Sequence, residues 1–256
     1  MHYNLLFNGC SFTAGAELEG KNKDFEYRDK HRYSQVISER TGKTYDNISR
    51  SGNSNDRITR ETIDWFERDN TCDLAIIQFT CITRIEFISK HEQHPTNFCP
   101  GGIKKWDLKW HTKNNEEHKN AQEAHEFYYK HFYNDNIGLY NFYKNLFIIE
   151  QYFEKNNIDY IFLKFRRSRF NVFKLDQEKL KMHDGKFNSL DFYWQLGCKN
   201  RYSTITPIVG KILDPNDKSN FATNYSDEGY PFLTGLHPSE LGHQKIADYI
   251  LKQLNK

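Results

Sequence analysis

The sequence predicts an α/β protein in which a mainly parallel sheet is flanked by helices. Short apolar runs alternate along the chain with segments of helical periodicity, which is typical of strand–helix–strand units. The apolar runs are nearly continuous, which indicates strands buried on both faces. The chain has 256 residues, including 20 Phe and 16 Tyr, and is long enough to bury a large core. We therefore expect residues 1–256 to form a single domain.

Each element is predicted from its local pattern. Strands are expected at Tyr3–Phe7, Thr44–Ile48, Leu74–Phe79 and Tyr160–Phe165. Helices are expected at Tyr33–Arg40, Asn55–Phe66, Leu139–Phe153 and Ser239–Leu254, with Gly42 as a stop for the first and Ser239 as an N-cap for the last.

Segments 88–135 and 168–232 break this alternation and are expected to be insertions after the third and fourth strands. Insertions at the carboxyl ends of parallel strands shape the ligand crevice in many such folds. They are expected to form a lid or specificity wall, or to be simple loop elaborations. Their aromatic residues fit sugar stacking, a dimer interface or a small hydrophobic core equally well.

Composition excludes several classes of function. The 36 basic and 34 acidic residues give a net charge of +2, which is too balanced for a nucleic-acid-binding surface. No apolar run approaches the length of a membrane span, and the N-terminus has no basic leader. The five cysteines include no CxxC pair, so neither a disulfide framework nor a zinc ribbon is expected.

These observations favour a cytoplasmic protein without membrane or nucleic-acid partners, and they leave the oligomeric state open. His91, His94 and Cys99 have a spacing that a metal could use, but no second cluster completes a site. We expect them to be surface loop residues, and we expect neither a metal nor another cofactor.

Ser11 is the candidate nucleophile. It lies in the segment Gly9–Gly15, directly after the first strand, where the chain turns. A serine needs an adjacent base to attack an ester, and His237, on the loop before the last helix, is the candidate. Sequence separation is no obstacle, because the first and last crevice loops of such a sheet can meet. The alternatives are that Ser11 is a helix N-cap and that His237 only packs.

Gly52 is the candidate oxyanion donor, together with the backbone N–H of Ser11. It lies in Ser51–Asn55, which follows the second strand and opens a helix. Acyl transfer requires backbone N–H groups, and often a side-chain amide, aimed at the developing negative charge. Asn53 or Asn55 could supply the amide, although turn chemistry with Ser54 or Asn55 as an N-cap explains the same residues.

Taken together, Gly9–Ser11 with Gly15, Gly52–Asn55 and His237–Ser239 with His243 resemble the SGNH/GDSL hydrolase superfamily, in a divergent branch common in bacterial and phage genomes. The resemblance covers nearly the whole chain. It implies a three-layer α/β/α, flavodoxin-like fold. It also implies Ser11 as nucleophile, Gly52 in the oxyanion hole, His237 as base, and esterase, lipase or carbohydrate O-deacetylase chemistry without a metal.

The sequence departs from that family in two places. The third block of the family reads Gly-x-Asn-Asp, whereas this chain has Gln78–Glu86 there, without the asparagine. Thr80 through its hydroxyl, Gln78 through its amide, or Asn53 or Asn55 could replace that donor. Thr234 stands where the family has the aspartate that precedes the histidine. Asp227 or Glu228 could fill this role, or a Ser–His dyad could act with a backbone carbonyl.

Gln78 and Arg84, at the end of the third strand, are candidate substrate-binding residues. Arg84 is expected to bind an anionic group, to anchor the loop, or to pair with Glu86. The leading hypothesis is a serine esterase that removes small acyl groups, acetyl above all, from a carbohydrate or related ester through a Ser11 acyl-enzyme. The alternatives are a ligand-binding protein of the same fold, which the missing family residues favour, and an O-acyltransferase.

Overall fold

The computed structural model describes residues 1–20, 24–88, 95–98, 115–164 and 237–254. Its centre is a four-stranded sheet in the order β2-β1-β3-β6. The strands are β1 (His2–Asn8), β2 (Tyr45–Asn47), β3 (Thr71–Phe79) and β6 (Asp159–Lys164). All neighbouring pairs are parallel. This order is the flavodoxin-like one for the first strands of a doubly wound sheet, as the resemblance implied.

The register brings the carboxyl ends of the strands together at one edge of the sheet. Phe7 of β1 pairs with Asn47 of β2 and with Ile76 of β3, and Phe79 of β3 pairs with Lys164 of β6. The middle of β3 is fully buried, as is expected for a strand covered on both faces. In such a sheet, ligands bind beyond the carboxyl ends of the strands.

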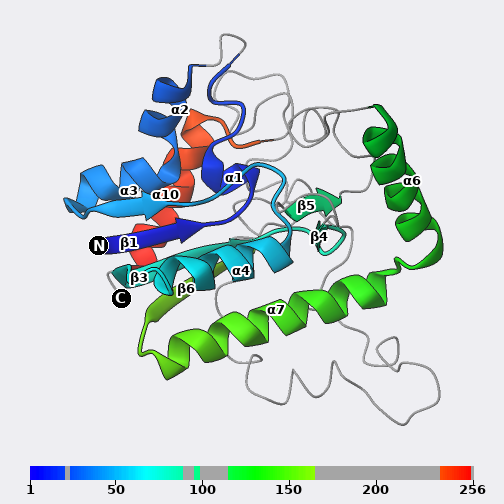
Figure 1. Ribbon diagram of the computed structural model, residues 1–256. Helices are drawn as coiled ribbons and strands as arrows, with labels where there is room; N and C mark the ends of the chain where they lie inside the picture. Colours follow the sequence, from blue (N-terminus) through cyan, green and yellow to red (C-terminus); the bar gives the residue numbers. More distant parts are fainter. Residues whose placement is uncertain (21–23, 89–94, 99–114, 165–236, 255–256) are drawn as a thin grey trace.

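Helices cover both faces of the sheet, so the predicted three layers are confirmed (Figure 1). On one face, α4 (Asn55–Phe66) and α7 (Asp135–Lys155) pack together over a core that includes Leu6, Ile77 and Phe79. On the other face, α3 (Tyr33–Thr41) and α10 (Glu240–Leu254) pack over Leu5, Phe7 and Ile76. Neighbouring residues of β1 therefore point into opposite cores.

Helix boundaries follow their caps. The α4 helix has the predicted bounds, because the Ser54 side chain accepts a hydrogen bond from the Arg57 N–H at 3.2 Å. Ser239 accepts one from the Gly242 N–H at 3.3 Å, as predicted for an N-cap of α10. The α7 helix begins before the predicted Leu139, because Asn134 caps it through the Ile137 N–H at 3.0 Å.

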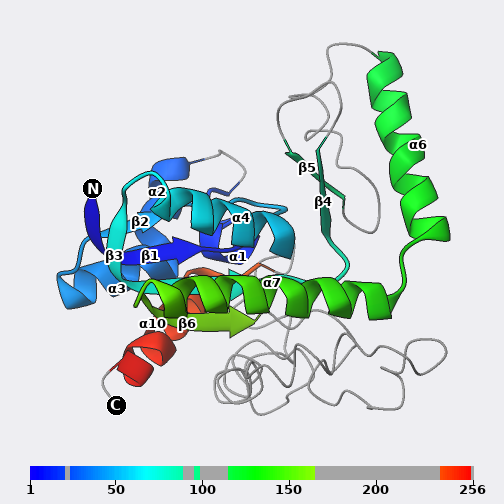
Figure 2. The ribbon, with the colours of Figure 1, turned by 60° about the horizontal axis from the view of Figure 1, so that its bottom comes forward.

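Regular structure that the sequence pattern did not reveal lies just before the first predicted insertion, 88–135, and within it. Strands β4 (Ile85–Ile88) and β5 (Pro95–Phe98) form an antiparallel pair, and α6 (Asn115–His131) follows. Figure 2 shows these elements on the side of the molecule towards which the strands of the main sheet point. The second predicted insertion, 168–232, lies outside the described residues. Within the described ranges, none of the helices has both the length and the apolar character needed to cross a membrane.

Candidate active site

Ser11 lies at the carboxyl end of β1, as the first residue of α1 (Ser11–Ala14). The N-cap position of this short helix belongs to Cys10, so the alternative that Ser11 is its N-cap is wrong. The side chain is buried, with 3% of the residue exposed, and its Oγ lies 3.9 Å from the Cys10 Sγ. A thiol is a weak acceptor. Within the described ranges, this weak contact is the hydrogen bond that the Ser11 hydroxyl makes.

A buried polar cluster supports the turn that carries Ser11. The Gln78 Oε1 accepts a hydrogen bond from the Thr13 hydroxyl at 2.7 Å, and the Gln78 Nε2 donates to the Phe79 carbonyl at 3.2 Å. Gly9 packs directly against this pair. A Cβ placed on it would meet the Thr13 Oγ1 at 2.3 Å. The Gln78 Nε2 also lies 3.3 Å from the Cys10 Sγ, so both ends of the amide contact the turn. Its role in binding substrate stays a prediction.

The loop that contains Gly52 is hydrogen-bonded to the turn that carries Ser11. The Gly9 carbonyl accepts hydrogen bonds from the Asn53 side-chain amide at 2.9 Å and from the Arg50 N–H at 3.4 Å. Gly52 has a φ of +86°, which favours glycine, and a Cβ there would meet nothing within 4 Å. The structure therefore places Gly52 beside open space on a loop that is tied to the residue two before Ser11.

Asn55 and Thr80 bind each other. The Asn55 Oδ1 accepts from the Thr80 N–H at 2.8 Å, and its Nδ2 donates to the Thr80 carbonyl at 3.3 Å. Both residues are buried. This reciprocal pair joins the start of α4 to the end of β3, so the Asn55 amide is already occupied. Its predicted role as an oxyanion donor finds no support in this geometry and stays a prediction, as does that of Thr80.

Arg84 anchors the loop. Its Nη1 donates to the Thr80 hydroxyl at 3.1 Å and to the Asn53 carbonyl at 3.2 Å. Glu86 does not face it but receives two hydrogen bonds from Arg60, at 3.0 and 2.9 Å. Of the predicted alternatives, loop anchoring is the one that these contacts favour, and substrate binding by Arg84 stays a prediction.

His237 lies against the nucleophile turn. Its ring centroid is 5.1 Å from that of Phe12, the residue after Ser11. Its Nδ1 lies 3.1 Å from the Glu17 Oε1. Segments separated by more than 200 residues in the sequence thus meet at the carboxyl edge of the sheet. Asp227, Glu228 and Thr234, the positions discussed for a third catalytic residue, lie outside the described residues.

His243 is a packing residue of the last helix. It is fully buried, stacks on Tyr33 at 5.8 Å between centroids, and accepts from the Tyr33 N–H through its Nδ1 at 3.2 Å. Burial is the main cause that lowers the pKa of His243 to about 3, and the positive charges of His237 and Arg32 lower it further. His243 is therefore neutral at physiological pH.

Sequence reasoning missed the residues that support the site. Thr13 and Tyr33 form part of the buried cluster, because the Tyr33 hydroxyl donates to the Thr13 Oγ1 at 2.8 Å. Glu17 provides the carboxylate beside His237. No pattern in the sequence separates Glu17 from Glu19, its acidic neighbour in the same loop. The described residues contain no cluster of His, Cys, Asp and Glu that could hold a metal ion.

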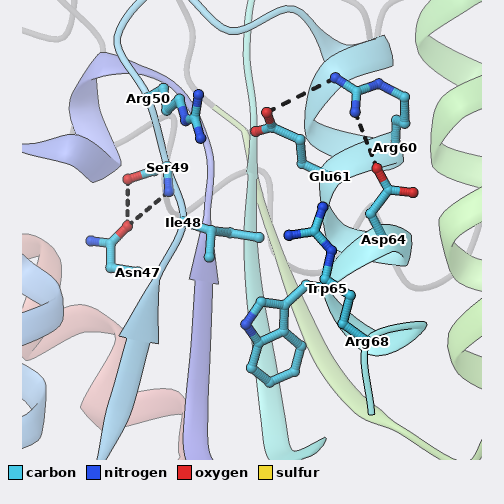
Figure 3. Close-up of a pocket in the computed structure, with 9 residues that line it drawn as sticks. All are labelled: Asn47, Ile48, Ser49, Arg50, Arg60, Glu61, Asp64, Trp65 and Arg68. Atoms are coloured by element: carbon cyan, nitrogen blue, oxygen red, sulfur yellow. Dashed lines mark hydrogen bonds and ion pairs between the residues drawn. The ribbon is translucent and has the colours of Figure 1, made fainter. Parts of the chain in front are cut away.

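A polar cavity of about 300 Å³ lies apart from these residues, along the edge of the sheet between the end of β2 and α4 (Figure 3). Arg50, Arg68 and Trp65 line it, and Arg60 is held there by Asp64 at 3.1 Å. None of the predicted catalytic residues belongs to its lining.

The site and sheet define an α/β protein with a serine at the end of its first strand and a histidine before its last helix. Solved structures that it resembles include a putative lipolytic protein of the G-D-S-L family from Desulfitobacterium hafniense DCB-2. That protein is 12% identical, with a TM-score of 0.46 and coverage of 97% of this chain and 98% of the other.

Two further similar structures are carbohydrate esterases. One is a family 2 enzyme with a carbohydrate-binding domain from Corynascus thermopiles (Myceliophthora fergusii). It is 11% identical, with a TM-score of 0.48 and coverage of 98% of this chain and 65% of the other. The other is a carbohydrate esterase whose active site is described as having divergent catalytic and non-catalytic binding functions. It is 10% identical, with a TM-score of 0.44 and coverage of 99% and 68%.

No protein-family model matches the chain, and no curated protein sequence matches it. Identities of 10–12% carry no residue-by-residue correspondence to this chain.

Proposed function

We propose that this protein is a serine esterase that removes small acyl groups, acetyl above all, from a carbohydrate or related ester. Ser11 is the nucleophile and His237 the general base. One observation carries the proposal: the ring of His237 packs on Phe12, the residue that follows a buried serine at the carboxyl end of β1. A nucleophile needs a base from a distant loop at this position, and His237 is the histidine whose ring contacts this turn.

The chemistry follows the acyl-enzyme route. The Ser11 Oγ attacks the ester carbonyl carbon while its proton passes to His237, and a tetrahedral oxyanion forms. The oxyanion collapses, the alcohol leaves with the proton from His237, and the acyl group remains on the Ser11 Oγ. Water then attacks the acyl-enzyme with His237 again taking the proton, and the carboxylic acid leaves.

Backbone N–H groups are the proposed oxyanion donors. Ser11 opens a helix, so its N–H has no carbonyl partner one turn earlier. Gly52 adjoins open space on a loop bound to Gly9. Because the Asn55 amide is engaged with Thr80, we infer that the hole lacks a side-chain amide. Loss of one such donor lowers the rate by about 100- to 1,000-fold, so a slow enzyme is expected.

The test is hydrolysis of p-nitrophenyl esters from acetate to octanoate, together with fluorophosphonate labelling, for the wild type, Ser11→Ala and Ser51→Ala. Ser51 lies beside Gly52 and serves as a matched control. Activity and labelling should both vanish in Ser11→Ala and persist in Ser51→Ala. A preference for acetate would support the acetyl assignment. Full activity in Ser11→Ala would contradict the proposal.

The second candidate is a protein of the same fold that binds a carbohydrate ligand without turnover. The Asn55–Thr80 contact favours it, because the Thr80 backbone occupies the Asn55 amide, a candidate replacement for the family's missing asparagine. This candidate predicts saturable binding of a glycan, measured by calorimetry, that Ser11→Ala leaves unchanged. It also predicts no labelling of the wild type.

A further inference from the structure

In the part of the chain that the structure describes, the Glu17 carboxylate reaches the imidazole of His237. The Glu17 Oε1 lies 3.1 Å from the His237 Nδ1. The approach has the length of an ion pair but not the alignment of a hydrogen bond. Such contacts in ligand-free sites are often poorly aligned and tighten when substrate binds. Phe12 contacts the same ring, so these two contacts to His237 come from α1 and the loop after it.

The backbone at Glu17 gives an independent reason to assign it a role. Its φ is +73°, in the left-handed region that favours glycine. Nearby Gly15 and Gly20, with φ of +75° and +59°, adopt the same region without a side chain. A glutamate held in a strained conformation beside a candidate catalytic histidine points to a function for its side chain.

We propose that Glu17 is the positioning carboxylate of this site, holding the His237 imidazole with Nδ1 protonated so that Nε2 receives the Ser11 proton. The inference rests on the proposed esterase function. It supplies the carboxylate that the sequence lacks at Thr234, from the first crevice loop instead of the last. When Nε2 takes the Ser11 proton, the imidazolium carries protons on both nitrogens, and the Glu17 carboxylate stabilises its charge without becoming protonated.

Among the described residues, His243 of α10 lies within electrostatic range of His237 and is neutral because of its burial. Arg32, at the start of α3, adds positive charge near His243. Glu240, at the start of α10, is bound by the Tyr27 hydroxyl at 2.7 Å and faces His31 at 3.8 Å. Glu17 is therefore the carboxylate in direct contact with the imidazole among the described residues.

The experiment compares the wild type with Glu17→Gln and with Glu19→Gln, a control on the same loop that makes no ion pair with His237 within the described chain. The ring of His237 is titrated by NMR and identified by its loss in His237→Asn. A nearby carboxylate favours the charged imidazole. In Glu17→Gln the midpoint should therefore move to lower pH, while Glu19→Gln should match the wild type.

Kinetics provides the second measurement. Removal of the carboxylate from a catalytic triad lowers kcat by about 10⁴-fold. The Glu17 side chain is 35% exposed and that of His237 is 17% exposed, and solvent weakens such pairs. We therefore expect kcat to fall about 10- to 100-fold in Glu17→Gln, with KM nearly unchanged. Glu17→Asp, which keeps the charge on a shorter side chain, should recover part of the loss.

An unchanged His237 midpoint in Glu17→Gln overturns the inference and leaves the role of Ser11 standing. Wild-type kcat in Glu17→Gln overturns it as well. Full activity in Ser11→Ala contradicts the esterase proposal, and the inference falls with it. A lowered midpoint with a lowered kcat, in a variant that unfolds at the wild-type temperature, supports a positioning role over a merely structural one.

Discussion

Replacing Gly9 with alanine should damage both the stability of the protein and its active site. The added Cβ would lie 2.3 Å from the Thr13 Oγ1 and 2.9 Å from the Gln78 Cβ, and real Cβ contacts do not approach closer than 3.0 Å. The Thr13 hydroxyl has little room to withdraw, because it donates to Gln78 at 2.7 Å and accepts from Tyr33 at 2.8 Å.

The magnitude follows from these contacts. Overpacking a rigid site costs about 1–3 kcal/mol, and each buried hydrogen bond lost when Thr13 moves adds about 1 kcal/mol. We expect Gly9→Ala to lower the free energy of unfolding by about 3 kcal/mol. In a chain of this size that corresponds to a fall in Tm of about 6–12 °C.

Thermal unfolding and the rate of fluorophosphonate labelling measure the two effects. Gly42→Ala is the matched control. Unlike Gly9, it lies at positive φ, +67°, and a Cβ there meets nothing within 4 Å, so only backbone strain of about 1–2 kcal/mol is added. Because the clash displaces the turn before Ser11, labelling should slow in Gly9→Ala and not in Gly42→Ala. A Gly9→Ala protein no less stable than Gly42→Ala, with wild-type labelling, would refute the reasoning.

Three further predictions concern single side chains. His243 stays neutral when folded, with its pKa lowered to about 3, whereas the unfolded chain binds a proton below about pH 6.5. The free energy of unfolding should therefore fall by about 1 kcal/mol for each pH unit from about pH 6.5 towards pH 3. Urea unfolding measured across this pH range should show a smaller fall in His243→Asn than in the wild type. Equal falls in the two proteins would contradict the prediction. Glu17→Gly removes the backbone strain of the positive φ and should raise the free energy of unfolding by about 1 kcal/mol. The same change should lower kcat. A loss of stability would mean that the contact of Glu17 with His237 is structural. Arg84→Met removes hydrogen bonds to Asn53 and Thr80. It should cost about 2 kcal/mol of stability and slow the labelling of Ser11. Arg84→Lys keeps the positive charge and should recover part of both losses.

The sheet could be predicted from sequence because its strands are buried on both faces. The run Leu74–Phe79 is apolar except for Gln78, and the structure places it in the centre of the sheet. The bounds of α4 were predicted from apolar residues at helical spacing, and the Ser54 side chain caps its first turn. In both cases the signal is local, so no knowledge of the tertiary structure is needed.

The elements β4, β5 and α6 could not be predicted in the same way. The elements β5 and α6 lie in a segment rich in His, Lys and Asn, where the apolar periodicity that marks buried elements is weak. The strand β4 is a run of only four residues just before that segment. The α6 helix leaves Phe127 more than half exposed, at 56%. The sequence of α6 therefore does not divide cleanly into one apolar and one polar helix face.

Candidate site residues could be named from sequence where their motifs are local. Ser11 and Gly52 are candidates because each lies in a short glycine-containing segment that directly follows a predicted strand. The binding of Asn55 to Thr80 joins loops that only the parallel register brings together, so sequence reasoning could treat each residue only as a separate candidate donor. The contact of Glu17 with His237 depends on the same tertiary arrangement.

The buried polar chain explains how residues at opposite ends of the sequence hold one geometry. Gln78 accepts from Thr13, Thr13 accepts from the Tyr33 hydroxyl, and the Tyr33 N–H donates to His243. Burial holds the pKa of Tyr33 well above its usual range, so its hydroxyl keeps the proton that it donates. The chain thus runs from the end of β3, beneath the Ser11 turn, to the helix that begins just after His237. Because an unpaired polar group at any of these buried positions would cost more than the hydrogen bond itself contributes, the chain fixes the last helix against the nucleophile turn.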